Sequence, residues 1–154
     1  MEKLETFNPS QIEIVNDSVT IAEELVCNFY KMSASQWFRL KYDVKTLVDL
    51  HHNEIVYGHF AQVVRYEGRP RNRILGTYDF YNICIQDHTI LSMLKECPGI
   101  NFFPFILYVI THELIHIVRF CKFLQNFDAS PREKMAEEKR VHENTQEILI
   151  SVPV

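Results

Sequence analysis

The stretch Thr111-His112-Glu113-Leu114-Ile115-His116 lies inside the most apolar part of the chain, residues 102–124. Its apolar surroundings predict a long helix, and a helix turns by about 100° per residue. The two histidines therefore lie one turn apart on the same helix face, where both imidazoles can reach a single metal ion. We expect the rest of the fold to be organised around this helix.

Glu113 follows the first histidine and is turned aside from the position that the two imidazoles share. It is therefore placed to contact a water molecule activated by the metal instead of the metal itself. Two histidines and a glutamate are costly to bury in an apolar run unless they are paired or bound to something. The alternative is a hydrogen-bonded histidine pair on an ordinary buried helix.

The size and composition of the chain are those of a globular protein. It has 154 residues, of which 47% are hydrophobic, which is enough to build a core. We therefore treat residues 1–154 as a single domain. The net charge of −4 gives no reason to expect a nucleic-acid partner or an anionic membrane partner.

Cysteine usage and the N-terminal sequence both predict a cytoplasmic protein. None of the four cysteines forms a C-x-x-C pair, and the chain is too long and too apolar to resemble a disulfide scaffold. Residues 1–6 carry acidic side chains and lack the apolar core of a signal peptide. A simple membrane span over residues 102–124 is unfavourable because that segment contains His112, Glu113, His116, Arg119 and Lys122.

The N-terminal half predicts helices followed by a small sheet. Helical spacing of apolar residues indicates a first helix that begins near residue 10 or 18 and ends near 32, and a second over about 36–50. Residues 55–67 and 73–86 are rich in β-branched and aromatic residues. A turn signal separates them, so we expect an antiparallel hairpin.

The C-terminal half predicts three helices. A short one begins at Asp87, the long apolar one covers about 103–126, and the last runs over about 131–150. Ser130 as the cap and Pro131 in the first helical position are a strong start signal for the last helix. The expected fold class is therefore α+β.

The last helix is the expected source of a third metal ligand, because a catalytic zinc usually takes three protein ligands. Helical phase places Glu138 near the centre of one face and Glu137 at its edge. We expect this face to be buried, and its members are Met135, Glu138, Val141, His142, Thr145, Ile148 and Leu149.

The roles of His142 and Glu138 at the metal site each have an alternative. His142 lies one turn beyond Glu138 on the same face, so it is either a hydrogen-bond partner of a ligand or the third ligand itself. Glu138 could instead form an ion pair with Arg119 or Lys122 at the edge of the core.

This arrangement resembles the gluzincin branch of the zincin metallopeptidases, in which a glutamate on the next helix follows H-E-x-x-H by some twenty residues. The resemblance covers about residues 102–149 and implies a minimal zincin-like domain. It implies Glu113 as the general base and a hydrogen bond from His142 to a ligand histidine. It also implies an edge strand that binds an extended peptide, which residues 78–85 could supply. The zinc ligands that it implies are His112, His116 and Glu138.

The expected function is hydrolysis of a peptide bond in a peptide or protein substrate by zinc-activated water, with Glu113 as the general base. A second group usually stabilises the oxyanion, and four residues are candidates. These candidates are His59, Tyr78, Tyr81 and His88.

Two other functions remain open. One is a non-catalytic, zinc-stabilised interaction module with a protein partner, in which metal binding contributes to folding. The other is a di-metal carboxylate protein, because Glu113 with His116 and Asp49 with His52 both read E/D-x-x-H. That class needs facing helices with several inward carboxylates, which the strand-rich middle of the chain disfavours.

Overall fold

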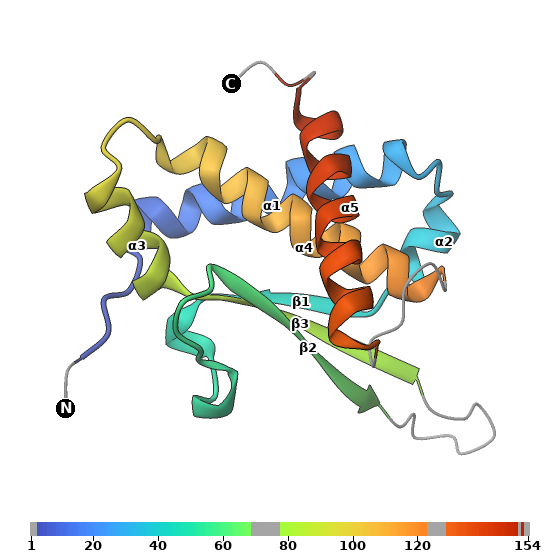
Figure 1. Cartoon of the computed structure of the whole chain (residues 1–154), viewed down its shortest axis with the longest axis horizontal. Coiled ribbons are helices and arrows are strands. Elements are labelled where there is room, and N and C mark those ends of the chain that lie inside the picture. Colours follow the sequence, from blue (N-terminus) through green and yellow to red (C-terminus); the bar gives the residue numbers. More distant parts are fainter. Residues whose placement is uncertain (1–2, 69–77, 123–128, 151, 153–154) are drawn as a thin grey trace.

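The computed structural model describes residues 3–68, 78–122, 129–150 and 152, and it combines helices with a small sheet (Figure 1). The predicted α+β class is confirmed. Two short 3-10 turns, Leu47–Asp49 and His52–Glu54, lie between the first two strands. The main elements are α1 (Pro9–Phe29), α2 (Ala34–Phe38), β1 (Tyr42–Lys45), β2 (Ala61–Gly68), β3 (Tyr78–Ile85), α3 (Asp87–Glu96), α4 (Phe102–Cys121) and α5 (Pro131–Leu149).

The sheet has the strand order β1-β3-β2. β2 and β3 pair antiparallel, with Ala61 opposite Ile85, which confirms the predicted pairing, although β2 begins at Ala61 and residues 55–60 are not part of the strand. Residues 69–77, which include most of the predicted turn, lie outside the described residues. β1 pairs parallel with β3, with Tyr42 opposite Tyr81, so the sheet is mixed instead of purely antiparallel.

The predicted helix over residues 36–50 is wrong. A capping box between Ser33 and Gln36 starts a helix, but α2 ends at Phe38. The chain then enters β1, where the backbone N–H of Tyr81 donates to the Lys41 carbonyl at 2.9 Å. Pairing with a strand forty residues away thus overrides a local spacing that fits a helix.

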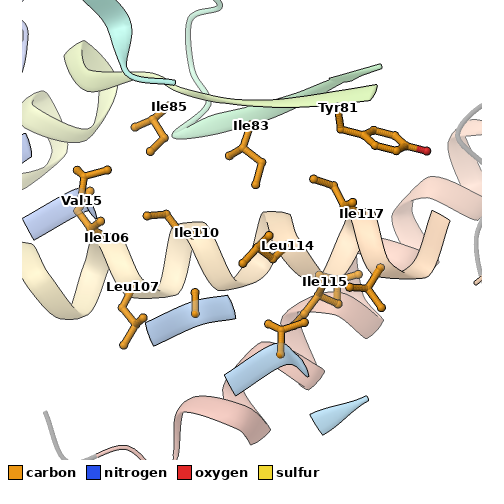
Figure 2. Close-up of a cluster of buried hydrophobic side chains, with 14 of the residues drawn as sticks. Val15, Tyr81, Ile83, Ile85, Ile106, Leu107, Ile110, Leu114, Ile115 and Ile117 are labelled. Carbon is orange, nitrogen blue, oxygen red and sulfur yellow. The ribbon is translucent and has the colours of Figure 1, made fainter. Parts of the chain in front are cut away.

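α4 is the central element, as its sequence predicts. It contacts α1, α5, β2 and β3. Figure 2 shows Ile106, Ile110 and Leu114 facing Ile83 of β3, while Leu107 points to the opposite side of the helix. These side chains are almost completely buried, so α4 is held on both sides by apolar packing.

The burial of α4 bears on its membrane-like composition. Among the described residues it is the one helix long and apolar enough to cross a membrane, with a mean hydropathy of 1.4. Yet 61% of the apolar window is buried inside the chain. An apolar helix that is mostly buried in this way is typical of the core of a soluble protein, and the fold is consistent with a soluble protein.

A buried carboxylate fastens the segment before β2 to the sheet. Glu54 has no exposed surface. It accepts hydrogen bonds from the His51 backbone at 2.9 Å, from Tyr66 Oη at 2.9 Å and from Asn82 Nδ2 at 3.0 Å. Burial by itself raises the pKa of Glu54, but these hydrogen bonds outweigh it and lower the pKa to about 2. The cluster around Glu54 therefore holds the chain in place just before β2.

Candidate metal centre

α4 and α5 bring two histidines and a carboxylate together. His112 Nε2 lies 3.0 Å from Glu138 Oε2, and His116 Nε2 lies 2.8 Å from Glu138 Oε1. One ligand atom from each of these residues falls within 4.8 Å of the others. The structure therefore places the residues expected as ligands at one point where the two helices cross (Figure 1).

The donor set fits a zinc ion. Two imidazoles and one carboxylate form the His₂Glu combination of catalytic zinc sites, which leaves the fourth position open. Donor atoms at zinc–nitrogen distance from a tetrahedral ion lie about 3.3 Å apart, so the three groups need only small movements to admit it. The Glu138 side chain is 59% exposed, so the site opens to solvent on the α5 side.

The contacts of Glu138 favour its ionised form. Hydrogen bonds from His112, then from His116, hold the pKa of the Glu138 carboxyl well below its usual range. A carboxylate must be deprotonated to bind a metal, so Glu138 is in the required state at neutral pH. His112 Nδ1 is buried and has no hydrogen-bond partner among the described residues, although ligand histidines usually have one.

Glu113 lies beside this cluster without being part of it. Burial raises the pKa of the Glu113 carboxyl, and the charge of Glu138 raises it further, while His116 and His112 lower it. A carboxylate with a raised pKa is a stronger base, which suits a group that accepts a proton from water.

Two hollows meet at Glu113 and Glu138. The first, of about 300 Å³, is bordered by the start of β2, by α4 and by the start of α5, and its lining includes Gln62, Val63, His116, Phe120 and Lys134. The second, of about 530 Å³, is lined by Phe60, Tyr108, Val109 and His112 among others. His59 and Ala61 border both hollows. The candidate metal centre therefore lies in a groove between β2 and α4.

The strand beside this groove is β2, not the expected segment over residues 78–85. That segment forms β3, which is the central strand and has β1 and β2 on its two sides. The Gln86 backbone N–H donates to the Phe60 carbonyl at 2.9 Å, so Phe60 and alternate residues after it bond to β3. Ala61 and Val63 therefore direct their backbone N–H and C=O groups to the open edge of the sheet.

The start of α5 is oriented differently from the prediction. Met135 is 75% exposed, and the buried stripe begins only at Val141. The side chain of Glu137 is 15% exposed and pairs with Arg119, whereas Glu138 lies at the surface beside the histidines. The expected alternative of a Glu138–Arg119 ion pair is thus wrong, because Glu137 takes that position.

His142 lies outside the three-residue cluster. Its Nδ1 atom is in hydrogen-bond contact with the hydroxyl of Tyr108, on α4. The Tyr108 ring lies one turn before His112, with ring centroids 5.9 Å apart. Burial and the charges of Glu138 and Glu113 raise the pKa of the Tyr108 hydroxyl. Sequence reasoning did not identify Tyr108 as a site residue. The available signal was its position four residues before His112, which is one helical turn.

The four expected oxyanion-stabilising residues lie in different surroundings. Tyr81 is buried and stacks on Phe120, and His88 Nε2 contacts the Val56 carbonyl at 2.9 Å. The side chain of Tyr78 lies outside the described residues. Of the other three, only His59 borders the groove.

The second E/D-x-x-H pair is not on a helix facing α4. Asp49 and His52 fall in the two 3-10 turns between β1 and β2. These two residues therefore do not supply the facing helix that a di-metal carboxylate site requires.

Comparison with known protein families, curated proteins and solved structures yields no match for this chain. What the site can do therefore follows from its own geometry. That geometry consists of three convergent ligand atoms, a half-buried carboxylate beside them and a groove along an open strand edge.

Proposed function

We propose that this protein is a zincin-like, zinc-dependent metallopeptidase. In this proposal His112, His116 and Glu138 hold the zinc, and Glu113 is the general base. The observation that carries the proposal is the convergence of two Nε2 atoms and a carboxylate beside a half-buried glutamate in an open groove. The four free cysteines support a cytoplasmic location for the enzyme.

A zinc ion bound here would polarise the substrate carbonyl and make water a better nucleophile at neutral pH. Glu113 accepts one proton from the attacking water as the carbon–oxygen bond forms. It then delivers this proton to the leaving amine as the peptide C–N bond breaks. The raised pKa of Glu113 suits both the acceptance and the later release of the proton.

The open edge of β2 supports a peptide as the substrate. An extended peptide can add to this edge as a further strand and bond to the backbone groups of Ala61 and Val63. Its side chains would then lie near the two hollows, which have volumes of about 300 and 530 Å³. In such a groove, hydrogen bonds to the peptide backbone provide affinity, and contacts between the peptide side chains and the hollows provide specificity.

The second candidate function is a zinc-stabilised interaction module without catalysis. It is favoured by the contacts that join α4 to α5 at the site, because a metal there would tie these helices together. Both candidate functions require the same bound metal. They differ in whether a peptide is cleaved and in whether Glu113 is needed for activity.

The deciding experiment compares wild type, His112→Ala, Glu113→Gln and the control His52→Ala, whose side chain is exposed. Elemental analysis should give one zinc per chain in all but His112→Ala. Cleavage of a peptide library should be lost in Glu113→Gln and kept in His52→Ala. Equal behaviour of wild type and Glu113→Gln on every peptide would rule out the peptidase. Two iron or manganese ions per chain would favour the di-metal class.

A further inference from the structure

Tyr108 and His142 form a pair at the edge of the groove that the proposed mechanism has not yet used. Tyr108 lines the 530 Å³ hollow together with His112, Glu113 and Glu138. His142 is exposed on α5 and contacts the Tyr108 hydroxyl through Nδ1. The two helices that supply the candidate ligands thus also supply this pair.

The direction of the hydrogen bond decides what Tyr108 can do. If neutral His142 carries its proton on Nε2, Nδ1 accepts the phenol proton and Tyr108 has nothing to donate elsewhere. If the proton is on Nδ1, His142 donates to the phenol oxygen and leaves the hydroxyl proton free to turn into the hollow. The hydroxyl itself stays protonated at neutral pH, because an ordinary tyrosine loses its proton only near pH 10.

The position of Tyr108 favours the second arrangement. Tyr108 lines the same hollow as two carboxylates, Glu113 and Glu138, whose negative charges both act on its hydroxyl. Negative charge around a hydroxyl favours a proton directed toward the groove. The Nε2 atom of the exposed His142 can then accept a hydrogen bond from water, so every polar atom of the pair is satisfied.

We infer that Tyr108 is a catalytic residue that donates a hydrogen bond to the scissile carbonyl oxygen as it becomes negatively charged, and that His142 is the positioning residue that holds Tyr108 in this role. The inference rests on the proposed peptidase function. It assigns to Tyr108 the task of the second oxyanion donor, a role that buried Tyr81 cannot fill. His59 borders the same groove from the β2 side, where it would lie against a bound substrate.

The kinetic test uses Tyr108→Phe, which removes only the hydroxyl. Losing one oxyanion donor costs about 100-fold to 1,000-fold in kcat, so we expect a fall of that size with KM and zinc content unchanged. His142→Ala should lower kcat less, and His142→Asn, whose amide can replace the Nδ1 donor, should restore part of the loss. In the Tyr108→Phe background, His142→Ala should have no further effect. Additive losses would overturn the positioning role.

A second measurement does not depend on turnover or on bound metal. The ¹⁵N chemical shifts of His142 in the metal-free protein report which ring nitrogen carries the proton. We expect the Nδ1–H form in wild type and a shift to Nε2–H in Tyr108→Phe. An Nε2–H form in wild type would overturn the inference, since Tyr108 would then donate to His142.

The outcomes separate this inference from the function on which it rests. If wild type cleaves peptide, Glu113→Gln does not, and Tyr108→Phe equals wild type, the peptidase stands and the role of Tyr108 falls. If wild type and Glu113→Gln are both inactive on every peptide, the peptidase itself falls.

Discussion

Arg119 on α4 and Glu137 on α5 form a two-pronged ion pair. The Nε and Nη2 atoms of Arg119 each donate to one carboxylate oxygen of Glu137 at 2.8 Å. Arg119 is buried, and Glu137 immediately precedes Glu138 in the chain. The ion pair therefore fixes the position of α5 where it presents Glu138 to the two histidines.

Replacing Glu137 with Gln should destabilise the fold and weaken metal binding. Removing one partner of a buried pair costs about 3 kcal/mol, at the lower end of the usual range because Tyr30 also bonds to Arg119. Urea unfolding measures the stability, and competition with a zinc chelator measures the affinity. Glu143→Gln, at an exposed position on the same helix, is the matched control. Unchanged zinc affinity in Glu137→Gln would show that the ion pair does not position Glu138.

Glu54 should make the stability of the fold depend on pH in the acidic range. Its pKa is about 2 in the folded protein, below the value of about 4.3 for an unfolded chain. The ionised form is therefore favoured by folding, and its contribution is fully present above pH 5 and lost as the pH falls toward 2. The difference between the two pKa values corresponds to about 3 kcal/mol of folding stability.

Urea unfolding between pH 7 and pH 3 tests this dependence. Glu54→Gln should be less stable than wild type at pH 7, and the gap should narrow at pH 3. Glu67→Gln, on the exposed side of β2, is the control and should follow wild type at each pH. A constant gap between wild type and Glu54→Gln across this range would contradict the expected ionisation.

Local sequence signals were sufficient for the elements that carry the site. α4 has its apolar spacing, and Ser130 accepts a hydrogen bond from the Glu133 backbone as a predicted cap does. The strand β1 could not be predicted, because its pairing partner lies forty residues away and its own residues also fit a helix. Pairing between distant segments is absent from any local pattern.

For the candidate site, too, only features within single helices could be predicted from the sequence. The one-turn spacing of His112 and His116 is a property of a single helix. Phase within the last helix also selected Glu138, but on a face expected to be buried, and the structure places Glu138 at the surface. The pairing of Glu137 with Arg119 depends on how α5 crosses α4, which phase within one helix does not determine. The contact between Tyr108 and His142 joins the same two helices and was missed for the same reason.

Zinc should raise the stability of the protein by an amount that grows with the logarithm of the free zinc concentration divided by Kd. A ligand that binds only the folded state contributes about 2.7 kcal/mol at a free concentration one hundred times its Kd. We expect a higher melting temperature with zinc and a lower one after chelation. His116→Ala should abolish the difference, and exposed His52→Ala should keep it. A zinc-induced shift that persists in His116→Ala would place the ion elsewhere.

The open edge of β2 should determine how tightly a peptide binds. Ala61→Pro removes a backbone N–H that points to the open edge and leaves the bonds to β3 in place, at the first residue of the strand, where proline is tolerated. The loss of one hydrogen bond worth about 1 kcal/mol should raise KM about fivefold, with kcat and zinc content unchanged. Ala61→Ser, which keeps the N–H, is the control. Gln62→Pro, which removes an N–H bonded to β3, should instead lower the stability of the fold. If Ala61→Pro has the KM of wild type, the peptide does not bind along this edge.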